Sequence, residues 1–182
     1  MAKIGLNNFR YAVATEAADG TLTYGTCTKP AKAVSFSFTP TNNDAKLYAD
    51  DFLAEADTAV TGGTCTIGID KLDAATYAAL LGQTVSTGDE VISDANEVAP
   101  YVGLGRIVRI MESGVQKFRV TFFAKVKFSE PSESDTTRGE SVQFSTYELN
   151  GVVAIPVNGQ WRKMKTFDTQ AAAVTYLEGL FS

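Results

Sequence analysis

The sequence predicts a β-rich α+β domain, a two-sheet β-sandwich or partly open barrel with one short internal helix and a C-terminal helix. The strongest observation is residues 101–128, whose first half is apolar and β-branched and whose second half alternates apolar and polar residues. Glu112, Ser113 and Gly114 lie between the halves and are typical of a turn. We therefore expect one long antiparallel hairpin, with strands longer than the usual length of about five or six residues.

The alternation in the second half predicts a half-buried strand with two different faces. The apolar face comprises Phe118, Val120, Phe122, Ala124, Val126 and Phe128. The polar face comprises Lys117, Arg119, Thr121, Lys125 and Lys127, interrupted only by Phe123.

Shorter segments with strand patterning precede and follow this hairpin. They are residues 7–14, 21–24, 33–39, 64–69, 90–92 and 140–155, the last with Gly151 as a predicted bulge. Asn158 and Gly159 predict a type I′ hairpin turn into a return strand at 161–167. Helical spacing predicts a short helix from Asp73 to Gly82 and a C-terminal helix capped by Asp168 or Thr169.

Residues 41–63 are ambiguous in the sequence. Helix propensity favours a helix with Asp44 as the N-cap, but the apolar residues are sparse. Five acidic residues and Lys46 give the segment 42–62 a net charge of −4. This composition indicates an acidic projecting element rather than a core element.

The composition of the chain argues against several classes of protein. The 182 residues suggest one domain, 1–182, and the net charge of −5 argues against a nucleic-acid binder with a basic surface. We recognise no signal-peptide h-region and no run long enough to span a membrane. Cys27 and Cys65 do not make a disulfide framework, and we expect reduced thiols and synthesis in a cytosol.

Catalytic and metal chemistry have little support. The chain has no histidine, which removes the commonest general base and metal ligand. The carboxylate pairs at 50–51 and 89–90 are adjacent residues and do not converge by spacing, and the oxygen cluster at 42–44 lacks EF-hand spacing. Gly103 and Gly105 lack a third glycine and a following helix, so glycines in a bent strand explain them better than a phosphate loop. We expect no enzyme, cofactor or metal site.

Charge is segregated along the chain. Six cations and Glu112 give residues 101–128 a net charge of +5, against −4 for residues 42–62. One interpretation is ordinary solvent-facing lysines. The other is head-to-tail self-assembly, in which the acidic arm of one subunit lies on the basic sheet face of another, formed by Lys117, Arg119, Lys125 and Lys127.

Several stretches, in collinear order, resemble one known family. They are KIGLNNF at 3–9, NNDAKLYADD at 42–51, GTCTIGID at 63–70, VAPYVGLGRI at 98–107, KVKFSEPSESDTTRGESVQF at 125–144 and KTFDTQAAAVTYLEGLF at 165–181. Together they resemble the major tail protein, or tail tube protein, of long-tailed siphophages of Gram-positive bacteria.

The resemblance implies a virion protein, assembled in the host cytoplasm, that forms stacked hexameric rings around a tape-measure protein. It also implies contacts with tail terminator and tip proteins, no membrane contact, and a lumen through which DNA passes without specific binding. Such lumens are expected to be electronegative, so the four cations of the basic sheet face should not line it. The family carries an arm that contacts neighbouring subunits, here at about 42–62, and we therefore expect an extended arm rather than a helix. The predicted contact residues of the arm are Asn42, Asn43, Asp44, Lys46, Leu47, Tyr48, Asp50, Asp51 and Phe52.

Other functions remain open at this stage. The same type of tube serves contractile injection systems. A small-ligand or carbohydrate-binding β-sandwich would need a concave pocket with convergent aromatic residues, and a hydrolase would have to use the acidic loops.

Overall fold

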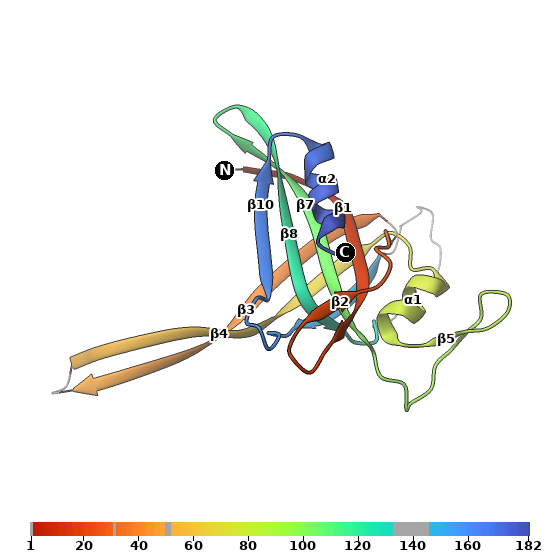
Figure 1. Cartoon of the computed structure of the whole chain (residues 1–182), viewed down its shortest axis with the longest axis horizontal. Helices are drawn as coiled ribbons and strands as arrows, with labels where there is room; N and C mark the ends of the chain where they lie inside the picture. The colour runs from red at the N-terminus through yellow and green to blue at the C-terminus, as the bar shows by residue number, and fades with distance from the viewer. Residues whose placement is uncertain (1, 31, 50–51, 133–145) are drawn as a thin grey trace, which may run out of the picture.

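The computed structural model describes residues 2–30, 32–49, 52–132 and 146–182, and it confirms a β-rich chain with two helices (Figure 1). The strands of the large sheet are β1 (Ala2–Glu16), β2 (Leu22–Tyr24), β3 (Ala33–Ala49), β4 (Phe52–Ile69), β7 (Tyr101–Glu112), β8 (Val115–Phe128), β9 (Tyr147–Val153) and β10 (Arg162–Phe167). A second sheet pairs β5 (Thr84–Val85) with β6 (Val91–Ile92). The helices are α1 (Ala74–Leu81) and α2 (Gln170–Gly179).

The large sheet is antiparallel throughout and has β8 at its centre. Its order is β2-β1-β7-β8-β9-β4-β3, and β10 also pairs with β8. The two strands share one edge of β8, because β10 pairs with residues 118–123 and β9 with residues 126–128. The sheet therefore divides along β8 into two parts that can pack on each other, an arrangement consistent with the predicted β-sandwich.

The predicted hairpin at 101–128 is β7 and β8, closed by a two-residue turn. Ser113 and Gly114 both have positive φ, 50° and 79°, and Glu112 pairs with Val115. Two positive φ angles are typical of a type I′ turn, whose twist matches that of the strands.

A β-bulge in β8 contradicts the prediction of one continuous apolar face. Val102 pairs with Val126 but Leu104 pairs with Phe123, so two residues of β8 lie opposite one residue of β7. One extra residue moves every later side chain to the other face of the sheet. Val126 therefore shares a core with Phe123 and not with Phe122.

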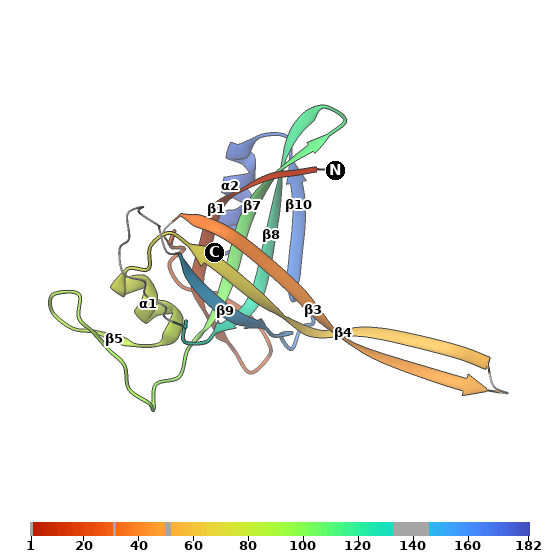
Figure 2. The same cartoon turned by 180° about the vertical axis from the view of Figure 1, so that it is seen from behind.

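Two cores result, one on each face of the β7–β8 hairpin. The first contains Phe118, Val120 and Phe122 and lies under α2, through Ala173 and Leu177. The second lies on the opposite side, where β3, β4 and β9 cross the sheet (Figure 2). Its buried members include Ile67, Leu104, Phe123, Val126 and Leu149. Strand β8 is therefore buried on both faces, not half-buried as the alternation predicts.

The glycines of β7 allow close approach of other elements. An added Cβ at Gly103 would lie 2.5 Å from the Tyr24 ring, and one at Gly105 would lie 2.3 Å from Leu177. The predicted bulge at Gly151 is absent, because its pairing with β4 continues in register. A Cβ at Gly151 would instead lie 2.9 Å from the ring of Phe128.

The predictions for the end of the chain are correct in part. Thr169 caps α2, and its hydroxyl accepts a hydrogen bond from the Ala172 amide at 3.4 Å. The predicted type I′ turn at Asn158–Gly159 is wrong, since only Gly159 has a positive φ. Strands β9 and β10 do not form a hairpin, because both pair with β8. Of the predicted strand at 140–155, residues 140–145 lie outside the described residues.

Candidate functional site

The predicted arm is a two-stranded antiparallel ribbon and not a helix. Strands β3 and β4 pair along their length, from Ala33 with Ile69 to Ala49 with Phe52, with three shifts of register on the way. Beyond the core, the ribbon projects away from the rest of the chain in both views (Figures 1 and 2). We call the segment 42–62, which the structure describes at 42–49 and 52–62, the β-ribbon.

The described side chains at the base of the β-ribbon are exposed on both faces. Asn42, Asn43 and Asp44 follow one another in β3, so they point alternately to opposite sides, and all three are exposed. Lys46, Leu47, Tyr48 and Phe52 are strand residues further along, whereas Asp50 and Asp51 lie outside the described residues. The predicted arm residues that the structure describes thus belong to the two paired strands, and at the base of the β-ribbon their side chains are exposed.

The bulge divides the predicted basic sheet face into two parts. Arg119 lies on the same side of β8 as Thr121 and Phe123, with which it lines a groove. The Nζ atoms of Lys125 and Lys127, beyond the bulge, lie 4.3 Å and 5.5 Å from the centre of the Tyr101 ring. The four cations therefore do not form one continuous surface.

Lys117 and Lys125 have carboxylate partners among the described residues. Lys117 lies 3.0 Å from Glu112, and this hydrogen bond raises the pKa of Lys117. Lys125 donates a short hydrogen bond to Glu16, whose other carboxylate oxygen accepts the Val157 amide at 3.2 Å. Both side chains of the Lys125–Glu16 pair are largely buried, at 12% and 18% exposure. Lys125 is therefore part of the folded framework rather than an open binding residue.

A groove of about 430 Å³ lies where β3 passes the β7–β8–β10 part of the sheet. Its described lining includes four cations, Lys3, Arg106, Arg119 and Arg162, and no carboxylate. Its aromatic residues are Phe36, Phe38 and Phe123. We call these seven residues the basic groove.

Arg106 is the most enclosed cation of the basic groove. Its guanidinium carbon lies 4.0 Å above the Phe36 ring, in the geometry of a cation–π contact. Burial lowers the pKa of Arg106 to about 10, so the side chain remains charged at neutral pH. Its Nε is buried, and within the described part of the chain it has no hydrogen-bond acceptor. Arg162 lies at the rim, exposed, with its guanidinium carbon 4.5 Å from the centre of the Trp161 ring.

Sequence reasoning singled out Arg106 and Arg119 as cations of the hairpin but missed Lys3, Arg162 and the phenylalanines of β3. Residues 3, 36–38 and 162 are far apart along the chain, and only the strand order brings them to one groove. The alternation of Phe36 and Phe38 with serine predicts a strand, but not which strands it faces.

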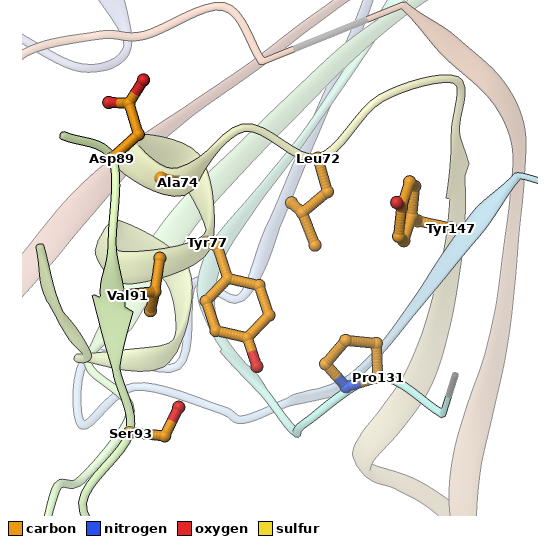
Figure 3. A pocket seen from close by; sticks show the side chains of 8 residues that line it. All are labelled: Leu72, Ala74, Tyr77, Asp89, Val91, Ser93, Pro131 and Tyr147. Carbon is orange, nitrogen blue, oxygen red and sulfur yellow. The ribbon is translucent and has the colours of Figure 1, made fainter. Parts of the chain in front are cut away.

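A second pocket, of about 420 Å³, lies between α1 and the β5–β6 sheet (Figure 3). Its wall contains Tyr77 of α1 and Tyr147 at the start of β9, with Leu72 and Pro131 between them and Asp89 at one end. Tyr147 is 45% exposed. This pocket is the place where a small uncharged ligand would have aromatic contacts.

The described residues contain no group of three or more acidic or cysteine side chains that could hold a metal ion. Cys65 is 1% exposed, and burial raises the pKa of its thiol to about 12. Cys27 is partly exposed, and burial raises its pKa as well. A thiol with a raised pKa is a poor nucleophile at neutral pH. In the part of the chain that the structure covers, no helix is long and apolar enough to cross a membrane.

No protein-family model matches the sequence, and no curated protein matches it.

Proposed function

We propose that this chain is a structural protein that self-assembles into stacked hexameric rings, forming the tube of a siphophage tail through which DNA passes. The observation that carries the proposal is the β-ribbon, which projects from the body with exposed residues on both faces of its base. A lone two-stranded ribbon is marginally stable in water. A ribbon of this kind gains stability when it packs on a second molecule.

The edges of the sheet support the same proposal. Strand β3 has 17 residues and lies at the end of the sheet, paired on one side with β4. A long edge strand offers unpaired backbone groups to another chain unless something covers it. The edge strand and the β-ribbon are different surfaces of one chain. When one surface of each copy binds the other surface of the next copy, the contacts are head-to-tail, and the copies form a closed ring or an open filament. Among these possibilities, the collinear resemblance to tail tube proteins favours the ring-and-tube assembly.

The net charge of the chain supports a conduit for DNA. The chain has a net charge of −5, and an electronegative wall keeps DNA from adhering. In the proposed tube, tape-measure, terminator and tip proteins are further partners, no cofactor takes part, and the assembled protein belongs to the virion. The inner tube of a contractile injection system is the nearest alternative, and a sheath gene beside the gene for this chain would favour it.

The direct test is negative-stain electron microscopy of the purified full chain over a range of concentrations. Rings or tubes are expected, and a strictly monomeric protein at high concentration in every buffer would refute the proposal. A shortened chain adds a control for the β-ribbon. Because Thr41 pairs with Gly62, an Asn-Gly turn can join them in place of residues 42–61. This variant should fold, by circular dichroism and thermal unfolding, yet remain monomeric.

A ligand-binding β-sandwich is the second candidate, favoured by the pocket between Tyr77 and Tyr147. Binding of a carbohydrate to the full chain, lost on the substitution Tyr147→Ala, would support it. Tube formation that is unchanged in Tyr147→Ala would separate the two functions.

A further inference from the structure

The basic groove has the chemistry of a binding site for carboxylates. Its lining combines four cations with the rings of Phe36 and Phe123, whose centres lie 5.8 Å apart. Apolar walls lower the local dielectric constant and strengthen the attraction between a cation and an anion. No carboxylate lines the groove among the residues that the structure describes.

Arg106 gives the groove a donor for which the described residues supply no acceptor. The Nε of Arg106 is buried and lacks a hydrogen-bond partner in the described part of the chain. Buried polar groups in folded proteins are nearly always paired, so an unpaired one indicates a missing partner. A guanidinium binds carboxylates with particular strength because its donors match the two oxygen atoms.

The acidic partner available on this chain is the β-ribbon, with five carboxylates and one lysine between residues 42 and 62. The β-ribbon cannot reach the groove of its own chain. Phe36 and Phe38 of β3 line the groove, and the same strand then continues outward into the β-ribbon (Figure 2). The occupant must therefore come from another molecule.

We propose that the basic groove of one copy receives carboxylate side chains from the β-ribbon of a second copy. This inference rests on the proposed function, and it names the surface that the projecting element contacts. A volume of about 430 Å³ suits a few side chains rather than the whole β-ribbon. Groove and β-ribbon lie on the same chain, so each copy can donate one contact and accept another.

A charge exchange tests the contact. The groove variant carries Lys3→Glu and Arg162→Glu, two exposed positions that leave the partly buried Arg106 in place. The ribbon variant carries Asp44→Lys and Asp57→Lys. Each should raise the concentration needed for pelletable assembly by about tenfold or more, because like charges meet at the contact. The chain carrying all four substitutions should assemble within about threefold of the parent, because opposite charges meet again.

The control variant carries Lys163→Glu and Lys165→Glu on β10. It changes net charge as the groove variant does, but its side chains lie on the α2 side of the sheet. Lys163 lines a cavity with Phe122 and Leu180, and the Nζ of Lys165 lies 4.9 Å from the centre of the Tyr176 ring. This variant should assemble like the parent, and higher salt should weaken assembly of the parent itself.

A mixture of the groove and ribbon variants gives a second readout. Each variant alone has matching charges at the contact, whereas alternating copies restore opposite charges. The mixture should therefore pellet at a concentration where neither variant does.

The outcomes separate this inference from the proposed function. If the parent assembles and the groove variant assembles equally well, the groove contact is refuted and the tube proposal stands. If the chain carrying all four substitutions assembles no better than the groove variant or the ribbon variant, the groove contact is also refuted. If the parent stays monomeric, both proposals fall. If the groove variant assembles normally but loses binding of a labelled single-stranded DNA, the groove is a nucleic-acid site and the ribbon contact is wrong.

Discussion

Replacing Phe123 with alanine tests whether β8 is buried on both of its faces. Phe123 is 1% exposed, and its ring centre lies 4.9 Å from that of Phe38, 5.8 Å from Phe36 and 6.3 Å from Trp161. Removing a buried phenylalanine loses its transfer free energy and leaves a cavity, about 3–5 kcal/mol in total. For a chain of this length each kcal/mol lowers Tm by about 2–4 °C, so Tm should fall by about 6–20 °C.

Urea unfolding of the full chain measures this loss directly. Trp161 is the only tryptophan, and its contact with Phe123 makes its fluorescence a local probe, with circular dichroism as the global one. The measurement needs a dilute sample that sediments as one species, because assembly raises the apparent stability. Met164→Ala is the control, since Met164 lines the same groove at 57% exposure and should cost less than about 0.5 kcal/mol. A loss below about 1 kcal/mol for Phe123→Ala would refute the two-core arrangement.

Three further outcomes follow from the packing and the ionisable groups. Gly105→Val should destabilise the chain by about 1–3 kcal/mol, because a Cβ there lies 2.3 Å from buried Leu177, and hydrogen exchange should show α2 opening more often. The pKa of Glu16 is lowered from 4.5 by its hydrogen-bonded lysine, so its stabilising effect is present above that value and is lost as pH falls through the lowered pKa. The stability difference between the parent and Glu16→Gln should therefore shrink between about pH 7 and about pH 3, and a constant difference would contradict the ion pair. In the native chain a thiol reagent should modify Cys27 slowly and leave Cys65 unmodified, whereas both should react in urea.

The strand positions could be predicted because alternation is a local property. Residues 101–112 and 115–128 are strands, as their pattern indicates, and the turn between them follows from Ser113 and Gly114. The helix at Ala74–Leu81 ends at Gly82 with a φ of 75°, in the way that glycine after a helix predicts. These elements depend on residues that are neighbours in sequence.

The bulge in β8 could not be predicted in this way. Apolar and polar residues continue to alternate through Lys125, Val126, Lys127 and Phe128, although the face that each occupies has changed. Alternation tells which residues are buried but not on which side, once one extra residue interrupts the pairing. Phe123 belongs to the second core. As the one apolar residue on the predicted polar face, it is the feature of the strand's sequence that points to this core.

In the β-ribbon, local propensity predicts the wrong secondary structure. Helix propensity at 44–57 is real, yet an isolated amphipathic helix needs a surface on which to pack, and propensity alone stabilises a helix weakly. Strand pairing from Ala33–Ile69 onward supplies a register that the following residues can continue. Pairing with the next strand of the same hairpin therefore outweighs the local preference for a helix.

The structure also changes how the net charge of residues 101–128 is interpreted. The sequence gives residues 101–128 a net +5, as if one basic surface faced one partner. That count already includes Glu112, which pairs with Lys117, and in the structure Glu16 from β1 also pairs with Lys125, which lowers the net charge from +5 to +4. The groove instead gathers Lys3 from β1 and Arg162 from β10, which no count over the hairpin includes. Cations in a concave, partly apolar site attract an anion more strongly than the same cations spread over a solvated sheet. The charge exchange at the groove is therefore expected to impair assembly more than the same change of net charge on the α2 side of β10.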